Sequence, residues 1–215
     1  MSFETDMPLQ NRVDPYGAIF RSPARGTMMG NRGGAIHNDA REIVRGYVSR
    51  RWIACVLEFK GRKRTVMSPG RYTELFFLDE AVALAAGHRP CAECRRERFH
   101  AFQNAWMGRA AGNFSDSPRA SQMDEELHCA RIDRRGNKVT YEAAPSHLPN
   151  GCFVDIAGSP FLVWNGALLL WTPEGYTHRD VYPRLETVTV LTPRPIVECI
   201  RAGYRPAVHS SAREF

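Results

Sequence analysis

The pattern of apolar and polar positions divides the chain into an irregular start, a helical middle and a strand-rich end. Residues 11–39 are rich in Gly, Arg, Pro and Asn and show neither a helical nor a strand period, so we expect a long arm packed on the body. The runs Arg51–Phe59 and Lys63–Met67 are rich in strand-forming residues and flank Lys60-Gly61-Arg62, which predicts a hairpin with a short turn. Another short strand is predicted over Leu75–Leu78.

Helical signals dominate the middle of the chain. Asp79 is a suitable N-cap for a helix over Glu80–Ala86, and Gly87 is placed to end it. A second helix is predicted over Arg95–Met107, because large apolar residues recur there with helical spacing. These residues are Phe99, Phe102 and Trp106. A third helix is predicted over Pro118–Arg131, with Pro at its start.

Beyond Gly136 the pattern changes to short apolar runs separated by turns. The predicted strands are Lys138–Tyr141, Cys152–Ile156, Phe161–Trp164, Ala167–Trp171 and Thr187–Leu191. Asn165-Gly166 is the clearest hairpin turn of the chain. Thr192 is expected to cap a last helix, Pro193–Ala202, which Gly203 ends.

Together these elements predict an α+β fold in two parts, residues 1–135 with the arm, hairpin and helices, and residues 136–215 as a small β-rich region with a C-terminal helix. The composition, with 43% hydrophobic and 24% charged residues, is that of a globular protein. The longest apolar runs fall far short of the ~20 residues that a membrane span requires, so we expect no transmembrane helix.

Residues 1–10 contain Glu4 and Asp6 and no apolar stretch after a basic start, so they do not resemble a secretory signal. We therefore expect a cytoplasmic protein whose six cysteines are reduced. In that compartment a close cysteine pair indicates a metal site or a redox pair rather than a disulfide.

The net charge of +6 is unevenly distributed. Residues 1–64 contain twelve Lys or Arg against six Asp or Glu, whereas residues 65–215 contain seventeen of each. A basic segment of this kind can attract a polyanion by displacing its counterions. However, 26 of the 29 basic residues are Arg, which a GC-rich genome and a well-solvated surface would equally explain.

Cys91 and Cys94 form a C-x-x-C pair that follows Pro90 and leads into a basic helix. The turn within such a pair brings both sulfurs to one side, where they can bind one zinc ion. The helix N-terminus and the adjacent arginines favour the thiolate form. A thioredoxin-like redox pair would require a preceding strand within a βαβ unit, a context that is missing here.

The run from Leu75 to Arg96, LFFLDEAVALAAGHRPCAECRR, resembles the second half of the zinc-binding module of bacterial Ada-type DNA-methyl-repair proteins. In that module a strand ending in Phe-Phe leads into a short alanine-rich helix and then into Arg-Pro-Cys-x-x-Cys-Arg. The resemblance implies a cysteine-rich zinc site in a protein that contacts DNA. The family's first half, a C-x-x-x-C pair that supplies two more ligands and the methyl-accepting thiolate, is absent from this chain.

A structural zinc site has four ligands, so two more are needed. Cys55 is the best candidate, because it precedes the pair where the family's other ligands would be expected. His37 is the next candidate, and His88 and His100 are further alternatives. Cys55 could equally be an ordinary buried thiol, and histidines such as the other three are more often surface or hydrogen-bonded side chains than ligands. We interpret Cys129, Cys152 and Cys199 as core thiols.

Other chemistry is less well supported by the sequence. Asp124 and His128 would share a face of their helix and could bind a metal or transfer protons, although an acidic solvated face with one histidine is the favoured explanation. Residues 25–37 combine arginines with flexible glycines, so they could bind phosphates or simply form an ordered arm. The motifs of P-loop proteins, zinc metalloproteases and serine hydrolases are absent.

These observations lead to one main functional hypothesis and two alternatives. The main hypothesis is a zinc-binding protein that contacts nucleic acid, in the first place DNA in repair or processing, through Arg21, Arg25 and Arg32. The first alternative is an enzyme, either a nuclease-like hydrolase that uses His37 or His128, or an acceptor that uses zinc-bound Cys55. The second alternative is a protein-interaction module built on the β-rich region.

Overall fold

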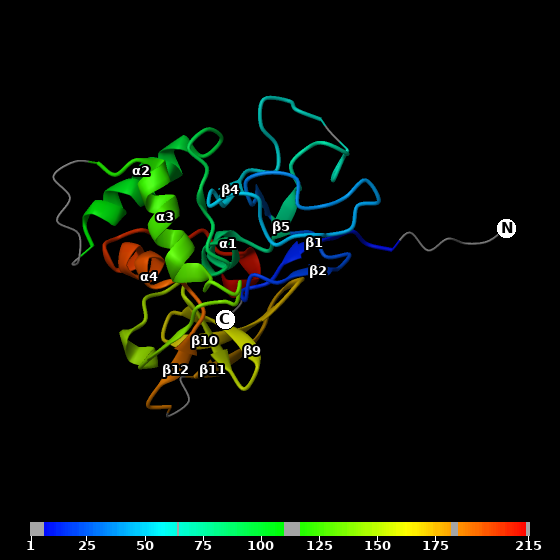
Figure 1. Cartoon of the computed structure of the whole chain (residues 1–215). Helices are drawn as coiled ribbons and strands as arrows, with labels where there is room; N and C mark the ends of the chain where they lie inside the picture. The colour runs from blue at the N-terminus through cyan, green and yellow to red at the C-terminus, as the bar shows by residue number, and fades with distance from the viewer. Residues whose placement is uncertain (1–6, 64, 110–116, 182–184, 214–215) are drawn as a thin grey trace.

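The chain folds into helices and sheets (Figure 1). The computed structural model describes residues 7–63, 65–109, 117–181 and 185–213. Within these ranges it contains four α-helices and two six-stranded sheets, so the predicted α+β class is confirmed. Helices α2, α3 and α4 lie together on one side, away from strands β1 and β2 (Figure 1). No helix in the described ranges has the length and apolar character needed to cross a membrane.

The first sheet has the strand order β2-β1-β5-β3-β4-β6 and mixes parallel with antiparallel pairs. Its strands are β1 (Gln10–Val13), β2 (Ile19–Arg21), β3 (Met28–Asn31), β4 (Ile53–Cys55), β5 (Leu75–Phe77) and β6 (Arg89–Pro90). The prediction of an arm without strands over residues 11–39 is wrong, because β1, β2 and β3 lie largely within it. Gly30 is one reason for the weak strand pattern, because the sheet leaves no room for a side chain at this position. A Cβ atom there would lie 2.3 Å from the carbonyl oxygen of Ile53 on the neighbouring strand.

The hairpin predicted over residues 51–67 does not form. In its described part, residues 51–63 and 65–67, the structure has one strand, β4, which pairs antiparallel with β3 and parallel with β6. The turn itself is present, with φ of 53° at Lys60 and 64° at Gly61. Strand propensity identified β4 correctly but says nothing about its partners, which come from distant parts of the chain.

The second sheet is antiparallel throughout, in the order β11-β10-β9-β8-β12-β7. Its strands are β7 (Tyr141–Ala143), β8 (Phe153–Ile156), β9 (Ser159–Trp164), β10 (Ala167–Thr172), β11 (Gly175–Val181) and β12 (Val188–Val190). The predicted Asn165-Gly166 hairpin is confirmed, with φ of 48° and 73° at its two residues. Strand β11 was not predicted, and β7 begins where the predicted strand over 138–141 was expected to end.

The predicted helices correspond to α1 (Glu80–Ala85), α2 (Arg96–Met107), α3 (Ala120–Arg131) and α4 (Arg194–Arg201), with short 3-10 helices at Pro145–His147 and Ser210–Arg213. The predicted N-cap of α1 is confirmed, since the Asp79 side chain accepts a hydrogen bond from Val82 N at 2.9 Å. The predicted cap of α4 is wrong. Its N-cap is Pro193, and the Thr192 hydroxyl instead accepts a hydrogen bond from Phe153 N at 2.8 Å.

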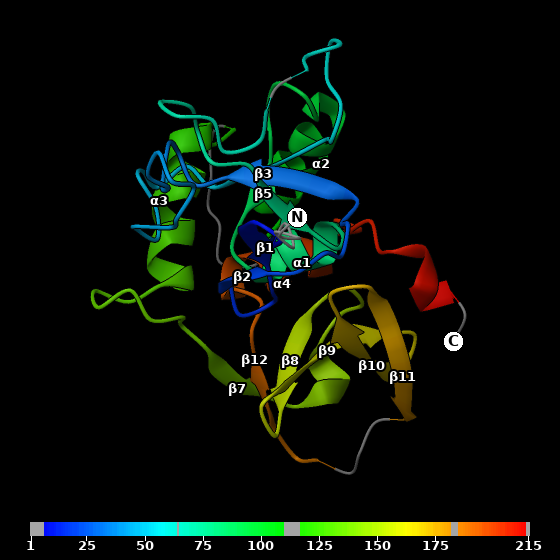
Figure 2. The same ribbon diagram turned by 90° about the vertical axis from the view of Figure 1, so that its right-hand side faces the viewer.

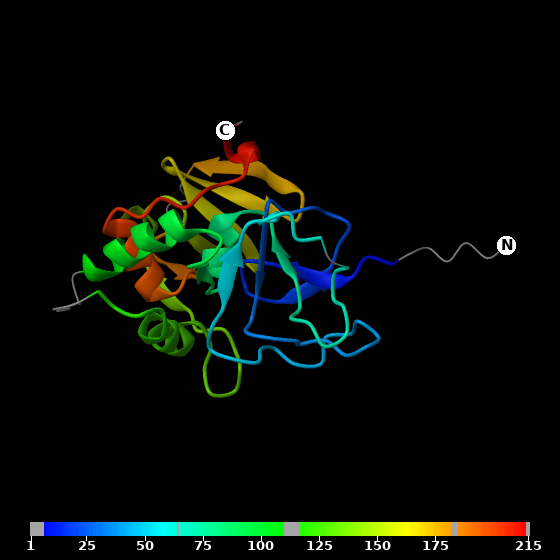
Figure 3. The same cartoon turned by 90° about the horizontal axis from the view of Figure 1, so that it is seen from above.

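Helix α1 lies between the two sheets, and all of its residues are buried (Figure 2). One apolar core joins α1 to both sheets and includes Phe77 and Leu162. The other core joins the helices, which gather at one end of the molecule (Figure 3), to the second sheet and includes Trp106 and Val154. Each core therefore contains residues from both sides of position 135.

The residues at the start of α1 also bind the last part of the chain. Asp79 Oδ2 accepts hydrogen bonds from the Tyr176 hydroxyl and from His209 N, both at 2.8 Å. Glu80 accepts a hydrogen bond from Ala207 N at 2.8 Å and another from the Tyr204 hydroxyl. Both carboxylates are almost fully buried, so these contacts fix the C-terminal segment against the centre of the fold.

Candidate metal centre and adjoining groove

Three cysteine sulfurs, those of Cys55, Cys91 and Cys94, lie within 4.8 Å of one another. The parallel pairing of β4 with β6 explains the proximity of the first two. Ala54 lies opposite Pro90 in this pairing, and Cys91 N donates a hydrogen bond to the Ala54 carbonyl at 2.9 Å. The turn that follows Cys91 brings the Cys94 sulfur close to the other two, just before α2 begins.

The surroundings favour the thiolate form at two of the three sulfurs, those of Cys91 and Cys94. The Cys55 thiol donates hydrogen bonds to Cys91 and Cys94, which raises its own pKa and lowers the pKa of the other two, that of Cys91 to about 5. Backbone N–H groups of Glu93 and Cys94 also donate to the Cys91 sulfur, and that of Val56 donates to the Cys94 sulfur. Metal ligation requires such deprotonated sulfur, so this arrangement suits a thiophilic cation.

The three sulfurs could occupy three corners of a tetrahedral zinc site. Among the described residues, no other group of His, Cys, Asp or Glu side chains converges in this way. The structure does not bring His37 to the group. Its ring nitrogens instead contact Thr73 Oγ1 at 2.6 Å and the Ser68 carbonyl at 3.3 Å, which corrects its prediction as a ligand.

The other histidine candidates are also occupied elsewhere. His88 is fully buried between the rings of Trp52 and Phe77, at centroid distances of 5.1 and 4.7 Å. Burial, reinforced by the nearby Arg32, lowers its pKa well below the usual value, so the ring is neutral. His100 is exposed and contacts Gln103 on its own helix.

A cavity of about 400 Å³ opens beside the three cysteines, which form part of its wall. Phe59 and Tyr72 contribute aromatic surface, and Arg62 and Lys63 contribute positive charge. Glu74 also lines the cavity. It is 3% exposed, its Oε2 accepts a hydrogen bond from Met67 N at 2.8 Å, and its Oε1 has no partner among the described residues.

A second cavity, of about 490 Å³, adjoins the first and is lined by Arg12 and Arg25. Leu57, Val66 and Phe76 line both cavities. We call the two cavities together the groove. It extends from the three cysteines to β1 and the segment that follows β2, so the basic N-terminal part of the chain supplies most of its lining.

The three arginines predicted to contact nucleic acid occupy different environments. Arg25 is exposed and lines the groove, and Arg21 is exposed on β2 with a hydrogen bond to the Pro8 carbonyl at 3.0 Å. Arg32 contradicts its prediction, because it is 4% exposed and donates a hydrogen bond to the Gly17 carbonyl at 2.7 Å. A side chain so enclosed stabilises the fold and cannot reach a phosphate.

Arg32 belongs to a buried group that we call the arginine cluster. It consists of Arg32, Arg89, Arg131, Trp52, His88 and Asp124. The guanidinium carbons of Arg32 and Arg131 lie 4.0 and 4.1 Å from the Trp52 ring centroid. Such stacking on an aromatic face stabilises cations that are removed from water.

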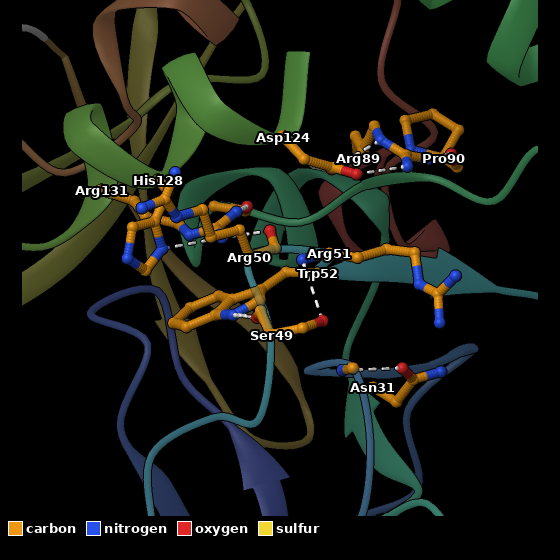
Figure 4. Close-up of polar contacts among 12 residues, drawn as sticks. Asn31, Ser49, Arg50, Arg51, Trp52, Arg89, Pro90, Asp124, His128 and Arg131 are labelled. Atoms are coloured by element: carbon orange, nitrogen blue, oxygen red, sulfur yellow. Dashed lines mark hydrogen bonds and ion pairs between the residues drawn. The ribbon is translucent and has the colours of Figure 1, made fainter. Parts of the chain in front are cut away.

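Asp124 and His128, considered as a metal or acid–base pair, have separate partners in this region (Figure 4). Asp124 forms two hydrogen bonds of 2.8 Å with the Arg89 guanidinium. His128 Nδ1 lies 3.2 Å from the Arg131 guanidinium, and its ring packs against Tyr47. Asp124 therefore links α3 to the first sheet, His128 packs against the loop that precedes β4, and neither residue joins a metal-binding group among the described residues.

Comparisons with protein-family models, curated proteins and solved structures found no match to this chain. The resemblance of residues 75–96 to the Ada zinc module therefore stays a prediction.

The sequence did not single out Arg12, Glu74 or Phe76 for the site. Glu74 directly precedes β5 and Arg12 lies on β1, so only the sheet order brings them to the groove. No local spacing could have identified them.

Proposed function

We propose that this protein binds one Zn²⁺ ion through Cys55, Cys91 and Cys94 and contacts nucleic acid through the groove beside that site. The observation that carries the proposal is the convergence of three thiols on the wall of a cavity. Three thiolates and one zinc ion have a net charge of −1. The positive potential of the groove therefore comes from its basic residues, which are not ligands of the metal.

Nucleic acid suits the groove on grounds of charge. Its lining contains four basic residues, Arg12, Arg25, Arg62 and Lys63. It contains two carboxylates, those of Glu74 and Glu93, and the latter is exposed and paired with Arg62 at 3.2 Å. An exposed pair of this kind contributes little to stability, so a phosphate can replace the carboxylate as the partner of Arg62.

Metal analysis of the purified protein tests the first part of the proposal. We expect about one zinc ion per chain in the wild type and a large loss in Cys55→Ser, Cys91→Ser and Cys94→Ser. Cys129→Ser is the matched control, because Cys129 is exposed and lies outside the group. Wild-type protein that is fully folded without metal would contradict the proposal. Fluorescence anisotropy of the zinc-loaded protein with labelled oligonucleotides at low salt tests the second part.

A second candidate function is a zinc-thiolate acceptor. It is favoured by the number of converging ligands, because three sulfurs leave one tetrahedral position without a protein ligand among the described residues. Cys94 is the most exposed of the three sulfur ligands. With methyl iodide, the thiolate would form an S–C bond as the C–I bond breaks and iodide leaves. Intact-protein mass spectrometry in a Cys129→Ser background would detect one added methyl group, and its absence would favour a binding role alone.

A further inference from the structure

Two partly exposed aromatic rings with cations over their faces lie along the groove. Lys60 Nζ lies 5.0 Å from the Phe59 ring centroid, and the guanidinium carbon of Arg62 lies 5.4 Å from it. Arg12 is placed in the same way, 5.0 Å from the centroid of Phe76. Phe59 lines the cavity beside the cysteines, and Phe76 lies where the two cavities adjoin.

Surfaces that bind single-stranded nucleic acid combine these two features, because bases stack on aromatic rings while cations bind the phosphates. From this arrangement we infer that the groove binds single-stranded nucleic acid, with unpaired bases on Phe59 and Phe76 in place of the cations that lie over these rings. The backbone would then lie beside Arg12, Arg25 and Lys63. This inference rests on the proposed function and specifies its substrate class.

A duplex fits the groove less well for a physical reason. A paired base has both faces stacked on its neighbours, so neither face is available to an aromatic side chain unless the base is extruded. Extrusion costs a few kcal/mol, which a single strand does not need to supply. A cavity of about 400 Å³ can accept one unpaired base, which would then lie beside Cys55, Cys91 and Cys94.

The arrangement also separates the two contributions to binding. Stacking is insensitive to salt, whereas each phosphate contact releases counterions and makes the affinity fall with salt concentration. Phe59 and Phe76 should therefore determine the preference for single strands, and the basic residues should determine the salt dependence.

The first experiment compares three labelled probes of about 12 nucleotides with the same sequence: single-stranded DNA, single-stranded RNA and duplex DNA. With zinc-loaded wild-type protein, we expect at least one single strand to bind about tenfold more tightly than the duplex. The DNA and RNA probes identify which sugar is preferred. Equal or tighter binding of the duplex would overturn the inference while leaving the proposed function intact, and no binding to any probe would overturn both.

The second experiment uses Phe59→Leu and Phe76→Leu. Loss of one stacked base is worth about 1–3 kcal/mol, so each variant should bind the preferred single strand roughly 5- to 150-fold more weakly. The slope of log K against log salt should stay unchanged. Phe20→Leu is the matched control, because Phe20 is a half-buried aromatic residue of the same sheet that does not line the groove.

Zinc content and thermal melting verify that the variants are folded. If Phe76→Leu is destabilised, Phe59→Leu decides alone, since Phe59 lies in a loop rather than in a strand. Wild-type affinity for single strands in a folded Phe59→Leu variant would contradict the inference.

Discussion

The groove and the arginine cluster are both built on the first sheet, yet they treat their polar groups in opposite ways. In the arginine cluster the guanidinium groups are enclosed and bonded to carbonyls or to a carboxylate, as in the bonds of Arg32 with Gly17 and of Arg89 with Asp124. In the groove the charged groups are mostly exposed.

The difference shows that residue type alone does not distinguish a binding arginine from a structural one. Arg25 and Arg32 belong to the same glycine-rich segment and have similar neighbours in the sequence. One of them lines an open groove, and the other is buried against Trp52. Accessibility to solvent decides the role of each of these two arginines.

The largest expected effect is a loss of stability when the arginine cluster loses its carboxylate. Asp124→Ala leaves Arg89 buried without its carboxylate, and removing one partner of a buried ion pair typically costs about 3–5 kcal/mol. Urea unfolding should show this loss. Glu125→Ala is the control, because Glu125 is exposed and lies 3.9 Å from Arg50, so its loss should change stability by less than about 1 kcal/mol. Equal effects of the two variants would contradict the assignment of Asp124 to the fold.

A reciprocal pair of variants tests the comparison directly. Arg32→Met should lower the unfolding free energy by about 1–3 kcal/mol, because it leaves the Gly17 carbonyl without its hydrogen bond, and it should not alter the salt dependence of nucleic-acid binding. Arg25→Ala should leave stability unchanged and flatten the salt slope by about 0.7 for each phosphate of a single strand that the variant no longer neutralises. The reverse pattern would mean that the two residues have been assigned to the wrong regions.

The smallest effect is expected from pH. Burial lowers the pKa of Lys138 to about 7, and its Nζ donates a hydrogen bond to the Ala85 carbonyl at 2.7 Å. Between this pH and the ordinary lysine value the unfolded chain binds more protons than the folded chain, so the stability should rise with pH.

Because the Lys138 residue is partly exposed, the rise should be shallow. Lys138→Met should flatten this part of the stability curve relative to the wild type, as measured by urea unfolding at pH 7, 8, 9 and 10. Parallel curves for the two proteins would show that Lys138 does not titrate in this range.

Much of the fold was predictable because its signals are local. The cap at Asp79, the stripe of Phe99, Phe102 and Trp106 and the Asn165-Gly166 turn depend on neighbouring residues alone, and the structure contains all three. Strands β1, β2 and β3 are short and weakly patterned, and they exist because of partners elsewhere in the sheet, so periodicity could not reveal them.

The candidate site divides in the same way. Cys91 and Cys94 are recognisable from their spacing, and Cys55 was the strongest further candidate. The prediction of His37 as a ligand was wrong, because a loop sequence does not determine which way its side chains point. The contribution of Phe76 and Arg12 depends on the order β2-β1-β5-β3, which places β1 beside β5. That order follows from tertiary packing and leaves no mark on local sequence.

The contacts of Asp79 and Glu80 with the C-terminal segment also affect when the molecule can fold during synthesis. Glu80 N donates a hydrogen bond to the Ala207 carbonyl at 3.1 Å, across more than half of the chain. Contacts so distant in sequence form late, because the intervening chain must first be ordered. Until residues 204–209 leave the ribosome, Asp79 and Glu80 have only part of their native partners, namely Val82 and Tyr176 for Asp79 and Arg95 and Arg98 for Glu80. The central layer of the fold is therefore completed only when the last part of the chain has been synthesised.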